Sequence, residues 1–261
     1  MSRERIYRTE AVILKRQDFG EADRLLTALS PDRGKLRLIG KGIRKPTSRK
    51  AGHLELFTHT NLLVARGRNL DIVTQAETIQ VFRGFRDDLT RTTYAYCVAE
   101  LVDQFATEGT ENVALFRLLL EVLGLLETAR RLDLLMRSFE LHVLDVAGYR
   151  PRLHTCPRCR QTLEPVVNFL SLAEGGVLCP RCGELDRTAR PLSLNAFKAL
   201  RFLQVQPLAA ADRLNLSARL RGELEQTMRD ILRYTLERQL KSTAFLDLVR
   251  RQDDARRLSQ T

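Results

Sequence analysis

The chain has 261 residues, of which 44% are apolar and 6% aromatic, and it contains no tryptophan. This apolar content is enough for a sizeable core built on Leu, Val and Ile, so wholesale disorder is excluded. No apolar run approaches the roughly 20 residues that span a bilayer, and residues 1–5 lead into a strand-like pattern without an apolar signal core. We therefore expect a soluble, cytoplasmic protein.

The net positive charge of the chain indicates what kind of partner it binds. The chain carries 43 Lys and Arg residues against 32 Asp and Glu residues, a net charge of +11. Eight basic residues and no acidic residue lie between Arg33 and Lys50. Such an excess suits a polyanion, either a nucleic acid or an anionic membrane. The alternative is a solvated basic face that only keeps the protein in solution.

The first eighty residues alternate apolar and polar side chains with a period of two, which is typical of strands. Turn residues at 31–34 and 66–69 separate strand-like segments. Five short strands in about eighty residues favour a small closed barrel, and an OB-fold is the leading candidate. The predicted strands cover residues 11–14, 24–30, 35–38, 54–65 and 70–79.

Beyond residue 85 the apolar period becomes helical. Asp88 is a plausible cap for a first helix that ends at Gly109, a second helix begins near Asn112, and a third ends at Gly148. Helices resume near Ser193 and Ser217. The predicted fold class is α+β: an OB-fold barrel (1–80), a helical domain in two parts (81–150 and 190–250) with a zinc module inserted between them (151–189), and a polar tail (251–261).

Four of the five cysteines form two C-x-x-C pairs separated by 19 residues: Cys156, Cys159, Cys179 and Cys182. Four thiolates at this spacing are the closed, tetrahedral ligand set of a structural zinc site, so we expect one structural Zn²⁺ per chain without a catalytic role. A redox-active dithiol is the alternative. Arg160 stands where a glycine often follows the first pair.

Two further residues with metal-binding or nucleophilic side chains are weaker candidates. His154 precedes Cys156 by two residues, and we interpret it as a neighbour of the site rather than a ligand. Cys97 lies on the apolar side of its helix and is interpreted as a core residue.

The basic stretch 33–50 is the second candidate site. Strict alternation at 35–38 predicts that Leu36 and Leu38 face a core while Lys35 and Arg37 project outward. Few aromatic residues accompany these charges, so we expect contacts to the phosphate backbone with little sequence preference. The predicted DNA-contact residues are Arg33, Lys35, Arg37, Lys41, Arg44, Lys45, Arg49 and Lys50.

Signals for an enzyme are weak. The sequence has neither a phosphate-binding G-x-x-x-x-G-K-[ST] loop nor an H-E-x-x-H pair, and its four histidines show no catalytic spacing with a nucleophile. Asp87 and Asp88 are interpreted as residues of a helix start rather than metal ligands. We therefore predict no catalytic residues.

Several motifs together resemble one known family. Residues 9–14 (TEAVIL), 19–24 (FGEADR), 34–37 (GKLR) and 40–42 (GKG) are similar to the first domain of the bacterial RecO DNA repair and recombination mediators. The similarity continues through residues 94–101, 137–141 and 148–151, the two cysteine pairs, and 240–246. It thus covers about residues 5–246, and the glycine-rich first-domain motif is its most specific part.

The resemblance implies an OB-fold, a helical bundle and a zinc module. It also implies binding of single- and double-stranded DNA, annealing of complementary strands and, with RecR as partner, loading of RecA onto strands covered by single-strand-binding protein. In the family an arginine just before a Phe-Glu-Leu motif receives the acidic carboxyl-terminal tail of single-strand-binding protein, and the matching position here is Arg137. Some members lack the cysteines, so the zinc serves architecture. No membrane partner is implied.

Two interpretations from other classes stay open. A zinc-containing nucleic-acid enzyme such as a nuclease would need acidic metal ligands, which the sequence does not supply in a recognisable pattern. A zinc-ribbon transcription regulator would need a base-reading helix and a sequence preference.

Overall fold

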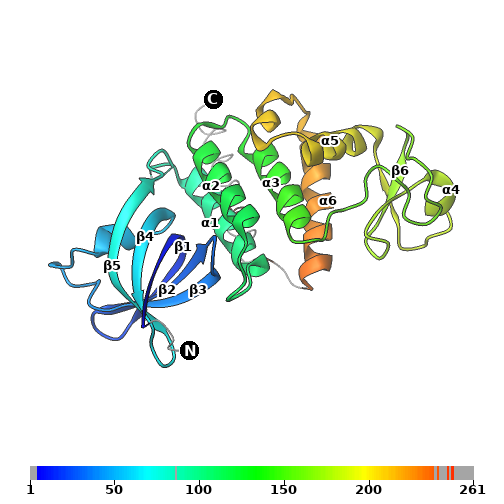
Figure 1. The fold of residues 1–261 in the computed structure, drawn as a ribbon. Helices are drawn as coiled ribbons and strands as arrows, with labels where there is room; N and C mark the ends of the chain where they lie inside the picture. The colour runs from blue at the N-terminus through cyan, green and yellow to red at the C-terminus, as the bar shows by residue number, and fades with distance from the viewer. Residues whose placement is uncertain (1–4, 86, 238–239, 241–245, 247, 250–261) are drawn as a thin grey trace, which may run out of the picture. The chain divides into compact units, whose positions relative to one another are not determined.

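The computed structural model describes residues 5–85, 87–237, 240, 246, 248 and 249 (Figure 1). The chain forms two compact units, one made of residues 1–127 and 242–261 and the other of residues 128–241. The predicted polar tail, residues 251–261, lies outside the described residues. Among the described helices, none is long and apolar enough to cross a bilayer.

The first unit begins with a closed five-stranded barrel in the strand order β1-β2-β3-β5-β4 (Figure 1). Neighbouring strands are antiparallel except β3 and β5, which are parallel. The barrel, followed by helices, confirms the predicted OB-like first part and the α+β class. Its strands are β1 (Ile6–Phe19), β2 (Asp23–Ser30), β3 (Gly34–Gly40), β4 (Thr58–Ala65) and β5 (Asp71–Val81).

The barrel interior is filled by aliphatic side chains from alternate strand positions, as a period of two requires. Ile13, Leu26 and Leu38 are at most 2% exposed and belong to one core cluster, against which Leu36 is packed. Residues 11–14 are all buried, and the register of β1 against β2 shifts between Ile13 and Lys15, which interrupts the strict alternation there.

The predicted strand 54–65 is shorter than expected at its start. Residues 51–54 form a 3₁₀ helix, η1 (Ala51–Leu54), and the strand begins only at Thr58. Phe57 lies between them with φ at +61° and donates its N–H to the carbonyl of Ile13 at 2.8 Å. Its ring packs edge-on against Phe85 and Tyr96, so this left-handed residue turns the chain while its side chain joins the core.

After the barrel, the first unit continues with α1 (Leu89–Phe105) and α2 (Val113–Thr128), whose last residue belongs to the second unit. Asp88 caps α1 as predicted by accepting a hydrogen bond from the N–H of Arg91 at 3.0 Å. The helix ends at Phe105 and not at Gly109. Ala106 is already extended, and the next residues bond with the start of β3: Thr107 accepts from the N–H of Lys35, and Gly109 donates to the carbonyl of Arg33.

The second unit is built on α3 (Leu132–Val146), which packs against α5 (Leu194–Val205), the 3₁₀ helix η2 (Leu208–Arg213) and α6 (Ala218–Leu236). Ser193 and Ser217 cap α5 and α6 with their hydroxyl oxygens, as their sequence positions predict. After α3 the chain turns at Gly148, whose φ of +83° favours glycine.

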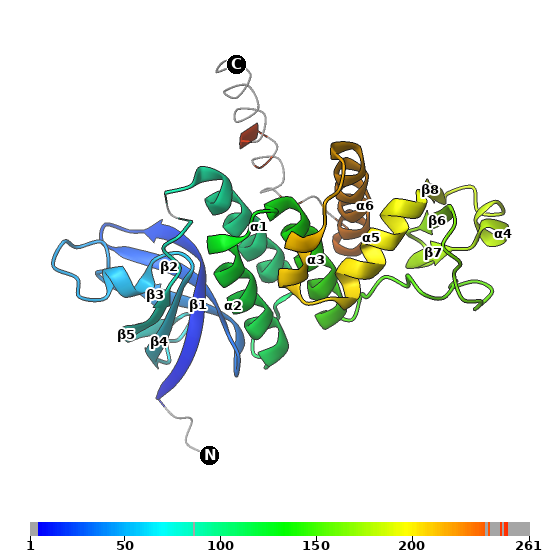
Figure 2. The same ribbon diagram turned by 90° about the horizontal axis from the view of Figure 1, so that it is seen from above.

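The cysteine module forms a small part of this unit. Its three-stranded sheet has the order β7-β6-β8 and lies beside the short helix α4 (Figure 2). The elements are β6 (Asn168–Ser171), β7 (Gly176–Leu178), α4 (Pro180–Gly183) and β8 (Arg190–Leu192).

Candidate nucleic-acid interface and metal centre

The basic stretch runs along β3 and through the loop to η1. Leu38 is buried and Leu36 is packed against the core, whereas Arg37 between them is exposed. This is the alternation that the sequence predicts, because successive side chains of a strand point to opposite faces.

Four members of the stretch are fully available to a ligand: Arg37, Lys41, Lys45 and Arg49. All four are exposed, and none of their side chains makes a hydrogen bond or an ion pair with another described residue. One comes from the strand and three from the loop that follows it. They form what we call the basic loop surface.

Lys35 is partly buried and paired with another residue of the protein. Its Nζ lies 3.2 Å from Oδ1 of Asp103 on α1, and it donates a hydrogen bond to the Asp103 carbonyl at 2.5 Å. The side chain of Lys35 is 21% exposed, so much of its charge is used in this internal pair rather than offered to solvent. The sequence pattern put Lys35 on the same face as Arg37 and gave no sign of this partner.

Lys50 and Arg44 are also engaged. The Nζ of Lys50 donates to the Val73 carbonyl at 2.8 Å, and burial lowers the pKa of this lysine although Asp23 opposes the shift. Arg44 is exposed, but its Nε lies 3.4 Å from a carboxylate oxygen of Asp18. These two residues contribute to the fold as well as to the positive field.

Arg33 and Arg66 both lie over the ring of Tyr7, and the sequence patterns did not single out Arg66. The guanidinium carbon of Arg33 lies 4.0 Å from the ring centroid of Tyr7, and that of Arg66 lies 5.3 Å from it. The ring is fixed by a 2.8 Å hydrogen bond from the Tyr7 hydroxyl to Asp71, and burial together with this bond raises the Tyr7 pKa. The turn between β4 and β5 therefore brings a further arginine to the side of the barrel where Arg33 lies.

The two cysteine pairs meet in space. The Sγ atoms of Cys156, Cys159, Cys179 and Cys182 all lie within 4.8 Å of one another, and those of Cys159 and Cys179 are 3.7 Å apart. Metal–sulfur bonds of about 2.3 Å in a tetrahedron would separate the sulfurs by about 3.8 Å, so the four residues fit one metal ion. His154 lies outside this group; its Nε2 is buried and makes no hydrogen bond to the described residues.

The surroundings of the cluster shift the pKa values of two of its thiols in opposite directions. Burial raises the pKa of Cys156, but hydrogen bonds from the backbone N–H groups of Cys159, Cys179 and Arg158 outweigh it and lower that pKa to about 6. Burial and shared hydrogen bonds with the other three thiols raise the pKa of Cys182 to about 12. Four thiols this close cannot all ionise unless a cation neutralises them, which is what a divalent metal does.

Arginine and glycine shape the two turns around the sulfurs. Arg160 adopts φ of +61° after the first pair, the backbone conformation that glycine favours. Gly183 after the second pair has ordinary helical backbone, and its importance is space: a Cβ there would lie 2.3 Å from the ring of Phe169. Arg158 links the pairs by donating to the Cys182 carbonyl at 3.2 Å.

Comparison with known proteins finds similarity along most of the chain. Residues 1–82 match the family model described as Recombination protein O N terminal, and residues 86–244 match Recombination protein O C terminal. This chain belongs to the RecO family. A protein of Roseiflexus sp. (strain RS-1) named DNA repair protein RecO is 50% identical over 95% of this chain and 87% of its own length.

RecO proteins of other bacteria are similar over nearly their full length. The protein of Dehalococcoides mccartyi (strain ATCC BAA-2266 / KCTC 15142 / 195) is 37% identical over 96% of this chain and 99% of its own. That of Pelotomaculum thermopropionicum is 39% identical over 93% of this chain and 94% of its own. Both are named DNA repair protein RecO, so a role in DNA repair follows from membership of the RecO family.

Arg137, the position that the RecO resemblance singled out, lies on α3. Its side chain is 6% exposed, and its Nη2 donates to Oε1 of the equally buried Glu140 at 2.7 Å. Its Nε and Nη1 are buried and have no hydrogen-bond acceptor among the described residues. The sequence singled out Arg137 only through the RecO resemblance and gave no sign that it is buried with Glu140.

Proposed function

We propose that this RecO chain binds single- and double-stranded DNA through the basic loop surface and anneals complementary strands. The observation that carries the proposal is the exposure of Arg37, Lys41, Lys45 and Arg49 without side-chain partners among the described residues. Point charges on a strand and its loop suit a phosphate backbone, and the shortage of exposed aromatic residues on the barrel suits binding without sequence preference.

The mediator role is the finer part of the proposal. With RecR as partner, the protein would load RecA onto strands covered by single-strand-binding protein, acting at the nucleoid in the bacterial cytoplasm during repair. Residues 1–80 would form the DNA-binding domain, and residues 81–150 and 190–250 the helical domain around the metal module at 151–189. No catalytic residue is assigned in this scheme.

Zinc is the metal we propose for the four cysteines. Cys156, Cys159, Cys179 and Cys182 would hold one Zn²⁺ through four thiolates, with no coordination position left for water or substrate. The metal would neutralise the thiolates and stabilise the module, so its contribution is structural.

The binding experiment compares two variants that each remove four positive charges. Fluorescence anisotropy with labelled single strands of unrelated sequence measures affinity, and a quenched-pair assay measures annealing. Weaker binding to all sequences alike, together with slower annealing, is expected only for the first variant. The first variant is Arg37→Ala/Lys41→Ala/Lys45→Ala/Arg49→Ala; the control, at exposed positions elsewhere, is Arg117→Ala/Lys198→Ala/Arg213→Ala/Arg219→Ala.

The same samples discriminate the competing classes. Strand cleavage on addition of magnesium would favour a nuclease, and a strong preference for one duplex sequence would favour a transcription regulator. Intact strands and equal affinities for unrelated sequences are the results that the proposal predicts.

Arg137 is proposed to receive the carboxylate of the single-strand-binding protein tail. If the pair with Glu140 opens, the released Nη2 could donate to that carboxylate together with Nε, which has no acceptor among the described residues, since one edge of a guanidinium binds a carboxylate through two parallel hydrogen bonds. In titrations with a labelled tail peptide, Glu140→Gln should bind more tightly than wild type because it removes the competing carboxylate. Arg137→Gln/Glu140→Gln should bind less tightly, and equal affinities for all three proteins would move the tail site elsewhere.

A further inference from the structure

The second unit carries two tyrosines beside one hollow. Tyr149 follows the turn after α3 and Tyr234 lies near the end of α6; they are 57% and 55% exposed. Both line a hollow of about 510 Å³ together with residues 170–176. Tyrosine rings usually bury most of their surface, so two exposed rings on one hollow indicate a surface suited to a flat ligand.

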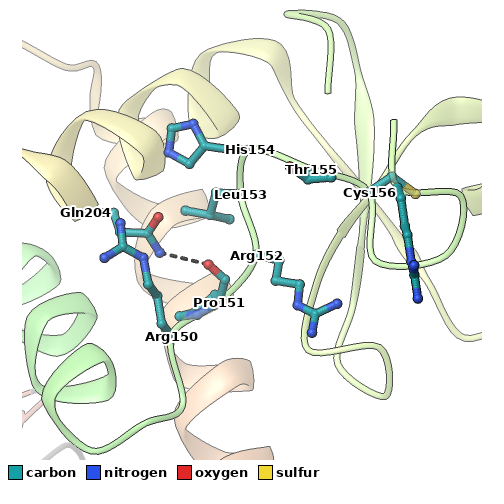
Figure 3. A pocket seen from close by; sticks show the side chains of 9 residues that line it. Arg150, Pro151, Arg152, Leu153, His154, Thr155, Cys156 and Gln204 are labelled. Atoms are coloured by element: carbon teal, nitrogen blue, oxygen red, sulfur yellow. Dashed lines mark hydrogen bonds between the residues drawn. The ribbon is translucent and has the colours of Figure 1, made fainter. Parts of the chain in front are cut away.

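One arginine lines the hollow with these rings, and a second follows it in the chain. Arg150 and Pro151 line both this hollow and a second one of about 530 Å³, which Arg152 also lines. Figure 3 shows Arg150 and Arg152 extending to different sides of the segment that joins α3 to the cysteine module. Arg150 thus borders the tyrosine hollow, and Arg152 borders the neighbouring one.

The segment is held in place by α5. Gln204 of this helix is 4% exposed and donates its Nε2 to the carbonyl of Pro151 at 2.8 Å (Figure 3). Its Oε1 is buried and accepts no hydrogen bond from the described residues, so the amide offers an acceptor that the described protein does not satisfy. A fixed backbone at Pro151 limits the conformational freedom that Arg150 and Arg152 must give up on binding.

The charge of this unit favours an anionic partner. Residues 128–241 contain 19 basic and 12 acidic residues, a surplus of seven, and residues 146–163 contain four arginines and no acid. Two acidic residues line the tyrosine hollow: Glu174, which pairs with Arg158 at 2.9 Å, and the exposed Glu237. A third, Asp145, pairs with Arg150 at 2.6 Å.

We infer that this surface binds single-stranded nucleic acid, with bases stacked on Tyr149 and Tyr234 and phosphates beside Arg150 and Arg152. Aromatic platforms alternating with basic side chains are how proteins hold single strands without reading sequence, whereas the bases of a duplex are already stacked on one another. The inference rests on the proposed DNA binding and extends it to the second unit. It also supplies stacking contacts to bases, for which the barrel has few exposed aromatic residues.

The absence of tryptophan from the sequence allows a direct test in the full-length protein. Tyr234→Trp introduces a single tryptophan at the platform, and its emission reports stacking. Oligo(dT) should quench this emission in step with the binding measured by anisotropy of labelled DNA. An abasic strand of equal length, which offers phosphates without bases, should quench it far less.

Variants separate stacking from a structural role. Tyr234→Leu should weaken oligo(dT) binding about fivefold or more, while Tyr234→Phe keeps the ring and should bind like wild type. Tyr96→Trp, at an exposed residue of α1, is the control, and its emission should not be quenched.

The possible results of the quenching experiment have distinct consequences. If anisotropy shows DNA binding while the emission of the Tyr234→Trp protein does not change, or if the abasic strand quenches equally, the inference is overturned and the basic loop surface stands. No DNA binding by wild type in any assay would overturn both proposals. Quenching by the single-strand-binding protein tail peptide but not by DNA would make the surface a protein-binding site and would also overturn the inference.

Discussion

Lys35 and Asp103 are 68 positions apart in the sequence, yet the Nζ of the lysine lies 3.2 Å from Oδ1 of the aspartate and 2.5 Å from its carbonyl oxygen. Lys15 completes the group with a 2.6 Å ion pair to the other carboxylate oxygen. One carboxylate on α1 thus fixes two strands of the barrel. The main contacts of Lys35 are therefore inside the protein, and we do not count it among the residues of the basic loop surface.

The first prediction concerns stability. Asp103→Ala should lower the free energy of unfolding by about 1–3 kcal/mol at pH 7, because it leaves Lys35 partly buried without its carboxylate. Urea denaturation measures the change. Lys41→Ala, which removes an exposed lysine of the same stretch, should change stability by less than about 0.5 kcal/mol. Equal effects of the two substitutions would contradict the assignment of Lys35.

The same group predicts a pH dependence. Burial raises the pKa of the Asp103 carboxyl, but Lys15 and Lys35 outweigh it and hold the pKa below its ordinary value. Because the folded pKa lies below the unfolded one, the carboxylate stabilises the fold above the unfolded pKa, and this stabilisation disappears as pH falls through the folded pKa. Asp103→Asn should therefore flatten the decline of stability between about pH 5 and pH 3. A decline as steep as in wild type would contradict this role of Asp103.

Metal content provides the third prediction. The protein purified without chelator should contain about one zinc per chain, since four thiolates complete one tetrahedral site. Cys179→Ser should lower metal content and thermal stability together, because metal binding is coupled to folding of the module. Cys97→Ser is the matched control: this cysteine is buried on α1, outside the cluster, so its replacement should leave the metal content unchanged.

The fourth prediction concerns the turns that follow the two cysteine pairs: introducing a glycine in the first and removing one from the second should change thermal stability in opposite directions. Arg160→Gly should stabilise the module by about 0.5–1 kcal/mol, since glycine adopts a positive φ without strain. Gly183→Ala should destabilise it, because the added Cβ would meet the Phe169 ring at 2.3 Å. Thermal melts of the metal-loaded proteins test both, and a stabilising Gly183→Ala would show that the ring can move aside.

Sequence patterns predicted the local structure well and the long-range pairings poorly. The barrel followed from alternation, and the caps at Asp88, Ser193 and Ser217 followed from short polar side chains before apolar runs. Cysteine spacing predicted the cluster because the two thiols of a C-x-x-C pair lie close enough to bind the same metal ion.

The sequence patterns could not predict contacts between segments that lie far apart in the chain. Gly109 looked like the end of α1, but main-chain bonds to the start of β3 end the helix at Phe105. Lys35 and Arg37 share one face of β3 and are indistinguishable by pattern, and only Asp103 separates their roles. The burial of Arg137 with Glu140 on α3 likewise has no sign in the sequence.

The salt dependence of DNA binding tests the central claim most directly. Each phosphate of a single strand that the protein no longer neutralises should reduce the slope of log affinity against log salt by about 0.7, so removing the basic loop surface should reduce it by up to about 3. The control variant with four other charges removed should keep nearly the wild-type slope. A folded Arg37→Ala/Lys41→Ala/Lys45→Ala/Arg49→Ala protein with an unchanged slope would contradict the account and remove this surface from the DNA site.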